Sequence, residues 1–260
     1  MVSTTTSYLS VSANLARSQQ IAAADPTVKR ETNYFLANIG KVKTVSDFVN
    51  NYQLFSYAMK AFGLADMTYA KGFVTKLLNG GVTDKSALAN TLSDPRYKAF
   101  ATAFDFADLG SAATTTAAAT TDVTTKFVQQ ALEDAQGKQN TGVELALYFK
   151  RMASSVTSSY GLLADSALLK VVQTRFGISP YTANADVDSQ ARYLDKVLNI
   201  KDLQDPAKVE KLVQRFTAMW DAGGNNTSAS LTNVLLAGNT SSLGLSSDLL
   251  LSIAGLKLGG

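Results

Sequence analysis

The chain lacks both cysteine and histidine throughout its 260 residues. Without cysteine it cannot form a disulfide, a thiolate metal site or a cysteine nucleophile. Without histidine it has neither the commonest general base nor the commonest metal ligand of proteins. Most familiar catalytic machinery is therefore excluded, and we expect a protein that is not an enzyme and that holds no cofactor and no metal ion.

Glutamate is scarce, since only four of the 21 acidic residues are glutamates. Aspartate favours helix N-caps, whereas glutamate favours helix interiors, so much of the negative charge is predicted to cap helices. The net charge of +3 comes from scattered basic residues and leaves no electrostatic footprint for nucleic acid. We therefore expect protein partners, and neither nucleic acid nor a small-molecule substrate.

Long apolar runs are missing as well, because no window of the sequence reaches the length of a membrane span. The N-terminus carries no charged side chain before Arg17 and no continuous apolar core, so a cleavable secretory signal is not predicted. We expect either a cytoplasmic protein or one exported by a route that reads an uncleaved, polar N-terminus.

One apolar frame occurs twice, at residues 34–64 and at residues 148–178. Each stretch opens with a Tyr-Phe pair and closes with Phe-Gly and a branched apolar residue, and the two align without a gap. A shared apolar spacing over this length indicates a shared packing face. The sequence therefore predicts an all-α array of helices, built from two diverged copies of one helical unit and ending in flexible polar termini.

The chain divides into five predicted segments around this repeat. They are a flexible or partly helical N-terminus (1–24), copy 1 (25–110), a linker plus connecting helix (111–140), copy 2 (141–224) and an apolar, Ser- and Gly-rich interaction segment (225–260). The linker is assigned from the low-complexity run 111–122, whose five threonines disfavour the alternative of an Ala-rich helix.

Start and stop signals place individual helices inside the two copies. One continuous helix is predicted from Thr44 to the stop at Gly63, with Phe48, Tyr52, Phe55 and Phe62 on its buried face. Further starts are predicted at Asp66, at the Asp-Pro pairs 25–26, 94–95 and 205–206, and at a capping box formed by Thr141 and Glu144.

Paired carboxylates can carry out acid–base chemistry in a chain without histidine. The candidates are Asp105/Asp108, Glu133/Asp134 and Asp186/Asp188. We favour a structural interpretation, because Asp186 and Asp188 lie at a helix start and the other pairs fall on helix faces expected to be exposed. A cation site at 186–188 would lack the glycine and distal glutamate of a calcium loop.

The C-terminal segment is predicted to bind a partner through its leucines. A helix of about ten residues is marginal in water, so this segment is expected to dock on Leu9, Leu15 and Ile21 of the same chain or on a neighbouring subunit. The predicted partner-binding residues are Leu249, Leu250, Leu251, Ile253, Leu256 and Leu258.

Residues 32–81 resemble the opening of the bacterial domain of unknown function 1217. The resemblance rests on four blocks, Tyr34-Phe35, Asn38-Ile39-Gly40-Lys41-Val42, Tyr57 to Leu64 and Asp66-Met67, and the run 94–110 also fits. It implies a helical, often repeated protein encoded in or beside flagellar gene clusters of alphaproteobacteria. The second copy departs from the pattern by losing the Lys60-Ala61 pair.

With this resemblance, the expected role of a non-enzymatic, protein-binding protein becomes a flagellar one. We expect a non-enzymatic flagellum-associated structural or assembly protein, located in the flagellum or basal body, whose partners are other flagellar subunits or itself. A cytoplasmic regulator or chaperone of flagellar assembly is the alternative, and a carboxylate-dependent hydrolase is a lesser one.

Overall fold

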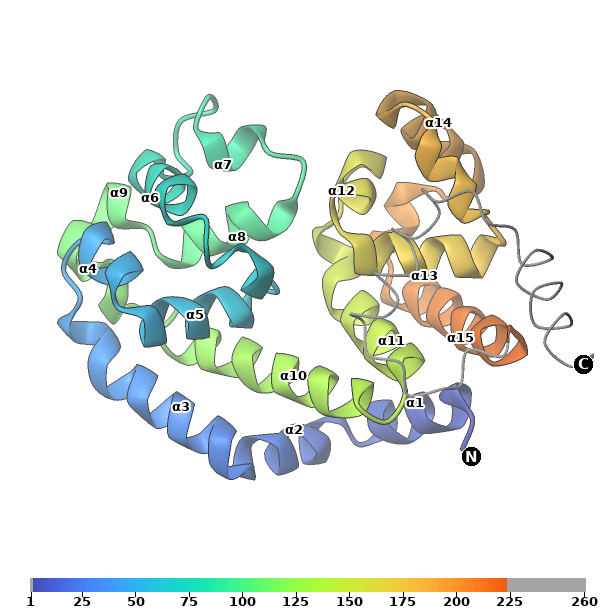
Figure 1. Cartoon of the computed structure of the whole chain (residues 1–260), viewed down its shortest axis with the longest axis horizontal. Coiled ribbons are helices and arrows are strands. Elements are labelled where there is room, and N and C mark those ends of the chain that lie inside the picture. Colours follow the sequence, from blue (N-terminus) through green and yellow to red (C-terminus); the bar gives the residue numbers. More distant parts are fainter. Residues whose placement is uncertain (1, 224–260) are drawn as a thin grey trace, which may run out of the picture.

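The computed structural model describes residues 2–223, and within this range it contains helices and no strand. The expected all-α fold is therefore confirmed for this part of the chain. Figure 1 shows two lobes side by side, with the N-terminal helices running beneath both. No helix among the described residues has the length and hydropathy needed to cross a membrane.

The first lobe surrounds a core of phenylalanines. Its fully buried rings are Phe35, Phe48, Phe55, Phe100, Phe104 and Phe127. Its helices are α3 (Pro26–Asn38), α4 (Val45–Asn50), α5 (Tyr52–Ala61), α6 (Lys71–Gly80), α7 (Leu88–Thr91), α8 (Pro95–Ala103), α9 (Phe106–Leu109) and α10 (Thr121–Gly137).

The second lobe has its own, more aliphatic core, which also takes in Tyr8 from the N-terminus. Its helices are α11 (Thr141–Met152), α12 (Ser159–Ala164), α13 (Ser166–Phe176), α14 (Val187–Val197) and α15 (Pro206–Ala222). Because α10 packs against both α5 and α11, it joins the two cores into one body.

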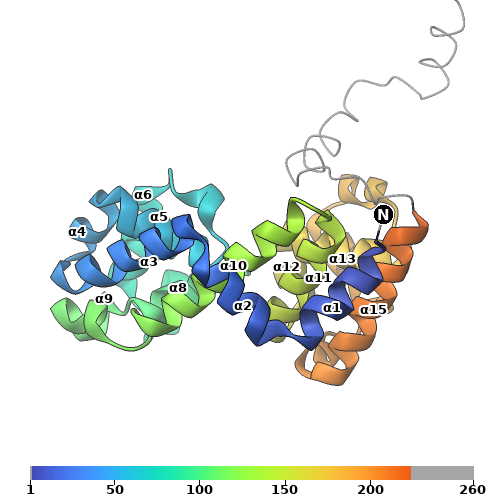
Figure 2. The same cartoon turned by 90° about the horizontal axis from the view of Figure 1, so that it is seen from below.

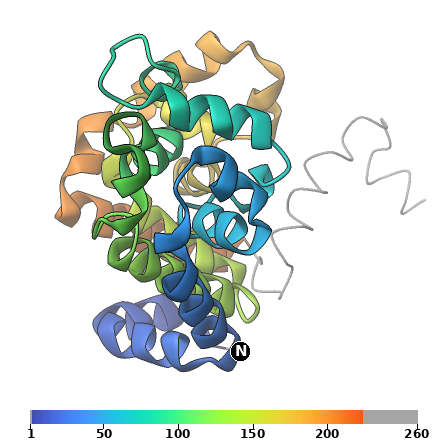
Figure 3. The same ribbon diagram turned by 90° about the vertical axis from the view of Figure 1, so that its left-hand side faces the viewer.

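Residues 4–38 form what we call the N-terminal arm, made of α1 (Thr4–Ala13), α2 (Leu15–Ala24) and α3. Within it, α1 packs against α11 and α15 of the second lobe, α2 against α10, and α3 against α5 of the first lobe. Viewed from below, α2 crosses the gap between the lobes (Figure 2), and seen end-on the arm lies along one edge of the molecule (Figure 3). The segment predicted as flexible or partly helical is thus helical.

Tertiary contacts explain why α1 forms from a Ser- and Thr-rich sequence that favours no helix. Ser3 caps the helix, and Asp221 at the end of α15 accepts the backbone N–H of Thr4 at 2.9 Å. Tyr8 is fully buried and donates its hydroxyl to Glu210 at 2.8 Å. The helix therefore depends on α15, a partner that lies far away in the sequence.

The elements of the two predicted copies follow one another at a constant shift. The 3₁₀ turns Ile39–Lys41 and Ala153–Ser155 are followed by α4 and α12 and then by α5 and α13, with starts 114 residues apart throughout. Gly63 and Gly177 both have positive φ, at 72° and 63°, as the Phe-Gly stop predicted. That the two copies superpose in space stays a prediction.

The continuous helix predicted from Thr44 to Phe62 is wrong, because the chain breaks at Asn51. Asn51 has φ −83° and ψ 92°, outside the helical region, and its side chain accepts the backbone N–H of Leu54 at 3.2 Å. Asparagine competes in this way with the helical backbone and starts a new helix. As a result Tyr52, predicted to be buried, is 64% exposed, whereas Phe48, Phe55 and Phe62 are buried as expected.

Two other predicted helix starts differ from those in the structure. Asp66 lies in a 3₁₀ turn, Ala65–Met67, whose backbone groups bond within the turn, and α6 begins only at Lys71. At the start of α11 the cap is Asn140, whose side chain accepts the N–H groups of the second and third helical residues at 2.9 and 3.3 Å. The predicted Thr141 capping box is therefore displaced by a better-placed neighbour.

The run predicted as a linker is packed onto the first lobe. Residues Gly110–Thr115 form a 3₁₀ turn, in which Ala113 and Thr114 are fully buried. Thr114 donates its hydroxyl to the backbone carbonyl of Val42 at 2.9 Å. The short threonine and alanine side chains allow this close approach, which a bulkier sequence would prevent.

Candidate functional site

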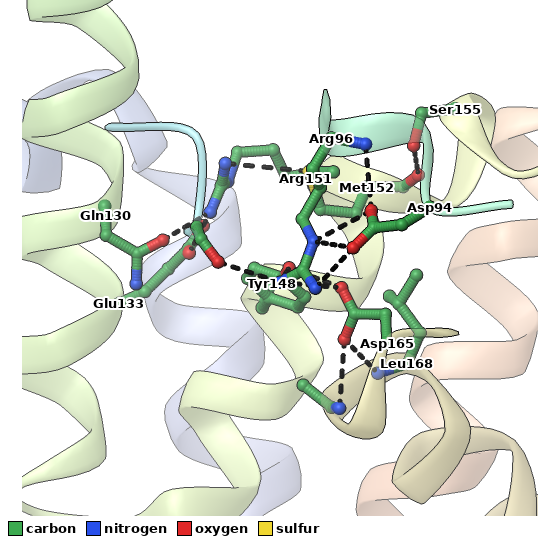
Figure 4. A network of polar contacts seen from close by, with 12 residues as sticks. Asp94, Arg96, Gln130, Glu133, Tyr148, Arg151, Met152, Ser155, Asp165 and Leu168 are labelled. Atoms are coloured by element: carbon green, nitrogen blue, oxygen red, sulfur yellow. Dashed lines mark hydrogen bonds and ion pairs between the residues drawn. The ribbon is translucent and has the colours of Figure 1, made fainter. Parts of the chain in front are cut away.

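The most elaborate polar arrangement of the described residues lies between the lobes, and we call it the junction network (Figure 4). Its first part is Arg96, near the start of α8. Asp94 caps that helix and receives the guanidinium of Arg96 at 2.8 Å. Arg96 also donates to the carbonyl of Gly63 at 2.8 Å, and the left-handed turn at Gly63 presents this carbonyl. Two segments of the first lobe, the turn at Gly63 and the start of α8, thus hold one arginine in place.

The second lobe contributes a tyrosine and an aspartate that contact this arginine. Tyr148 of α11 donates its hydroxyl to Asp165 at 2.6 Å, and the guanidinium of Arg96 lies 3.4 Å from both groups. Asp165 is the N-cap of α13, where it accepts two backbone N–H groups. One carboxylate therefore starts a helix of the second lobe and binds a cation of the first.

The second part of the junction network centres on Glu133, which the sequence analysis placed on an exposed helix face. That expectation is wrong, because Glu133 is fully buried. Arg151 of α11 binds both of its oxygens, at 2.8 and 2.6 Å, and Gln129 donates to it at 2.9 Å. The face of α10 that carries Glu133 is covered by α11, which no local pattern in α10 reveals.

The junction network continues to the N-terminal arm. Gln19 of α2 donates to the side-chain carbonyl of Gln129 at 2.7 Å, and Arg151 lies over the ring of Tyr148 at 5.1 Å. A connected series of polar contacts therefore links the arm and both lobes. Its residues are spread from position 19 to position 165, so no motif in the sequence signals it.

Electrostatics keep the junction network charged. Burial lowers the pKa of Arg96, but its hydrogen bond to Asp94 and the charges of Tyr148 and Asp165 outweigh burial and raise it. Burial raises the pKa of Tyr148, and the neighbouring Asp165 raises it further. The arginine thus stays a cation and the tyrosine stays a hydroxyl donor. Such an arrangement fixes geometry, since each acidic group is already bound to a cation or a donor.

The other candidate carboxylates are also engaged in local structure. Asp134 pairs with Lys60 at 2.8 Å. Asp186 caps α14, as its position at a helix start predicted, and the bond from Ser189 lowers the pKa of Asp186. Asp105 caps α9, a role that was not predicted for it. Asp188 accepts the hydroxyl of Tyr160 at 2.8 Å, and Asp108 accepts that of Thr83. The three pairs are not brought together in one place.

Glu144 is the acidic side chain with the most perturbed titration. It lies in the first turn of α11 against the end of α10, where a β-carbon on Gly137 would overlap its carboxyl group. Burial, and then the charges of Asp134 and Glu133, raise the pKa of Glu144 to about 8. This group therefore changes charge near neutral pH, inside the contact between the two lobes.

The exposed apolar side chains of the N-terminal arm form a second kind of candidate site. Helix α2 has no buried residue, and its Ile21 is 66% exposed. Leu9 on α1 and Leu36 on α3 are 43% and 47% exposed. These exposed apolar side chains, one on each helix of the arm, make the arm a candidate surface for another protein.

The predicted partner-binding leucines, from Leu249 to Leu258, lie outside the described residues. Their predicted docking surface is described, and its three side chains remain accessible in part. Leu9 and Ile21 are exposed, and Leu15 is half-buried at the start of α2. The association of the tail with this surface stays a prediction.

The fold and its junction network define a two-lobed, all-α protein whose inner charges tie the lobes together. The chain belongs to a family of proteins of unknown function, DUF1217, whose profile matches residues 61–209. The match begins inside the stretch 32–81 on which the resemblance rested, so the blocks before residue 61 lie outside it.

The chain is also similar to a solved structure. The chain is 47% identical to protein AGR_C_984 from Agrobacterium tumefaciens, known from an X-ray crystal structure. The TM-score is 0.76, and the similarity covers 85% of this chain and 96% of that one. No curated protein matches the chain.

Proposed function

We propose that this protein is a non-enzymatic component or assembly factor of the bacterial flagellum that acts by binding other protein subunits, or further copies of itself. The flagellar part rests on the family, since the resemblance implies genes in or beside flagellar clusters. The binding part rests on the described surface. Location in the flagellum or basal body follows from the same proposal.

The observation that carries the binding role is the exposed N-terminal arm. Helix α2 packs against α10, yet none of its ten residues is buried and Ile21 stays in contact with water. Burying an isoleucine side chain stabilises a contact by about 1.5–3 kcal/mol. A partner laid along the arm would gain this contribution and meet both lobes at once.

The junction network supports a structural role in a second way. It binds the lobes through buried, charge-assisted hydrogen bonds, and such bonds are stronger and more directional than neutral ones. A rigid two-lobed body presents a fixed surface to its neighbours, as an assembled structure requires. The carboxylates of the junction network bind cations or cap helices, and this weighs against the lesser alternative of a hydrolase.

A cytoplasmic regulator or chaperone of flagellar assembly remains the second candidate, because an exposed apolar arm also suits transient binding. A deletion strain examined for motility and for hook–basal-body structure tests the flagellar role in either form. Fractionation then separates the two, since an axial component must occur in sheared filaments or purified basal bodies. A deletion strain with normal motility and normal basal bodies would contradict the whole proposal.

The arm itself is tested by a matched pair of substitutions on α2. Ile21→Asp introduces a charge at the exposed apolar position, and Gln20→Asp introduces the same charge at the adjacent exposed position. We expect Ile21→Asp to reduce motility in the complemented deletion strain while Gln20→Asp restores it. Equal complementation by both variants, at equal protein levels, would exclude the arm as the binding surface.

A further inference from the structure

A cationic cleft opens on the second lobe, on the side formed by α13 and α15. Its volume is about 190 Å³. Its charged rim consists of four cations, Arg175 at the end of α13 and Lys208, Lys211 and Arg215 along α15, and one carboxylate, Asp202. We call this rim and the apolar floor beneath it the cationic cleft. None of these residues belongs to the junction network.

Three of the four rim cations have no carboxylate partner in the described part of the chain. Lys208 is bound to Asp202 at 2.7 Å, but no such ion pair involves Arg175, Lys211 or Arg215 within residues 2–223. Lys211 and Arg215 are also four residues apart on one helix, a spacing at which like charges repel. Burial and the charge of Arg215 lower the pKa of Arg175. This concentration of positive charge would be relieved by a bound anion.

The floor of the cationic cleft is apolar. Leu198, Leu203, Val209 and Leu212 are buried side chains that line it, and Phe176 is partly exposed there beside Arg175. A small inorganic anion would use the rim and leave the floor unused. The complementary ligand is a peptide that carries a carboxylate next to several apolar side chains.

The chain contains such a segment beyond the described residues. In residues 246–253, Ser-Ser-Asp-Leu-Leu-Leu-Ser-Ile, Asp248 stands directly before three leucines. Asp248 is also the one acidic residue after Asp221. Its carboxylate suits the two arginines of the rim, because a guanidinium binds a carboxylate through paired N–H groups.

We propose that residues 246–253 of the same chain occupy the cationic cleft, with Asp248 between Arg175 and Arg215 and the following leucines on the apolar floor. This places the C-terminal segment on the second lobe and leaves the N-terminal arm open. It differs from the docking on Leu9, Leu15 and Ile21 that the sequence suggested. It does not depend on the flagellar role.

Chain length favours an intramolecular contact. Helix α15 ends at Ala222, and its cleft residues lie 7 to 14 positions earlier, which is roughly 10–21 Å back along the helix at 1.5 Å per residue. A flexible stretch of the length between Gly223 and Asp248 has a root-mean-square span of about 25–30 Å. The span is similar to the distance, so the effective concentration of the segment at the cleft is high.

The 260-residue chain offers a clean test because it contains no cysteine. The variant Ser252→Cys carries a single environment-sensitive fluorophore within the proposed segment. We expect blue-shifted emission in this variant, and emission like that of the labelled free peptide 241–260 once Arg175→Ala and Arg215→Ala are added. The control pair Leu9→Ser and Ile21→Ser changes the alternative surface and should leave the emission blue-shifted. Far-UV circular dichroism checks that each variant keeps its helices.

A carbodiimide cross-link between a carboxylate and an amine gives a second measurement on the unlabelled parent chain. Mass spectrometry should find Asp248 joined to Lys211 or Lys208 in the monomeric fraction, and the link should be absent from Asp248→Asn. The proposal is overturned if the label reports a water-like environment in the parent, or if its emission survives loss of both arginines. It is also overturned if the control pair abolishes the shift, or if dilution abolishes it, because the segment would then bind the arm or a second copy.

Discussion

The contact between Glu133 and Arg151 gives the sharpest stability prediction, because a fully buried carboxylate depends on one arginine. The Glu133 side chain has no exposed surface, and that of Arg151 is 18% exposed. Breaking a buried ion pair by removing one partner costs about 3–5 kcal/mol, since the other charge is left in a medium of low polarity. We expect Arg151→Met to lower the free energy of unfolding by this amount.

The same loss translates into a change in melting temperature. For a protein of this size class, 1 kcal/mol corresponds to roughly 2–4 °C, so the midpoint should fall by about 6–20 °C. Denaturant unfolding followed by far-UV circular dichroism reports on the helices of both lobes. Fluorescence of Trp220, the single tryptophan, reports on the second lobe.

Two control variants distinguish the buried charge from general damage. The double variant Glu133→Gln/Arg151→Met removes both charges and keeps an acceptor for Gln129, so it should recover most of the loss. Lys208→Met breaks an exposed pair of similar length, 2.7 Å, and should lower the stability far less than Arg151→Met does, because solvent screens the exposed charges. A single variant that loses no more than the exposed control, or a double variant as unstable as the single one, would refute the argument.

Two further predictions concern the contacts of α11. Gly142→Ala should destabilise the protein by about 1–3 kcal/mol and make α1 accessible to proteolysis. The reason is that a β-carbon at position 142 would lie 2.6 Å from Trp220 and 2.7 Å from Thr4. Gly72→Ala is the neutral control, because a β-carbon there would have no neighbouring atom within 4 Å. Stability should also fall as the pH rises from about 5 to about 8, since the folded pKa of Glu144, about 8, exceeds its ordinary value of 4.5. The folded state binds the extra proton in that window, at an upper limit of about 1.4 kcal/mol per pKa unit. Glu144→Gln should flatten the profile measured by denaturant titration, and an unchanged profile would contradict the assignment.

Local signals in the sequence predicted the three Asp-Pro helix starts correctly, because capping is a local interaction. Asp25, Asp94 and Asp205 each precede a proline, and each accepts backbone N–H groups of its own helix. Gly63 takes the left-handed conformation for an equally local reason, since it follows the last turn of α5. Such residues need no knowledge of the rest of the fold.

The junction network could not be predicted in the same way, because its partners are brought together only by packing. Glu133 meets Arg151 across two helices, and Arg96 meets Asp165 across two lobes. The pattern of apolar and polar residues along α10 is the same whether the face with Glu133 points to water or to α11. Asn51 shows a different limit of prediction from sequence. Its side chain competes with the helical backbone and interrupts an apolar periodicity that predicts one continuous helix.

The N-terminal helix is held by the last helix of the second lobe, and this has a consequence for the order in which the protein is made. The backbone of Thr4 binds Asp221, a residue 217 positions later. A ribosome releases the first helix long before it synthesises α15, and a ten-residue helix without its partner is marginal in water. Helix α1 can meet α11 earlier, but it gains the contacts of Thr4 and Tyr8 with α15 only when that last helix has emerged, so the first helix of the described chain completes its packing late.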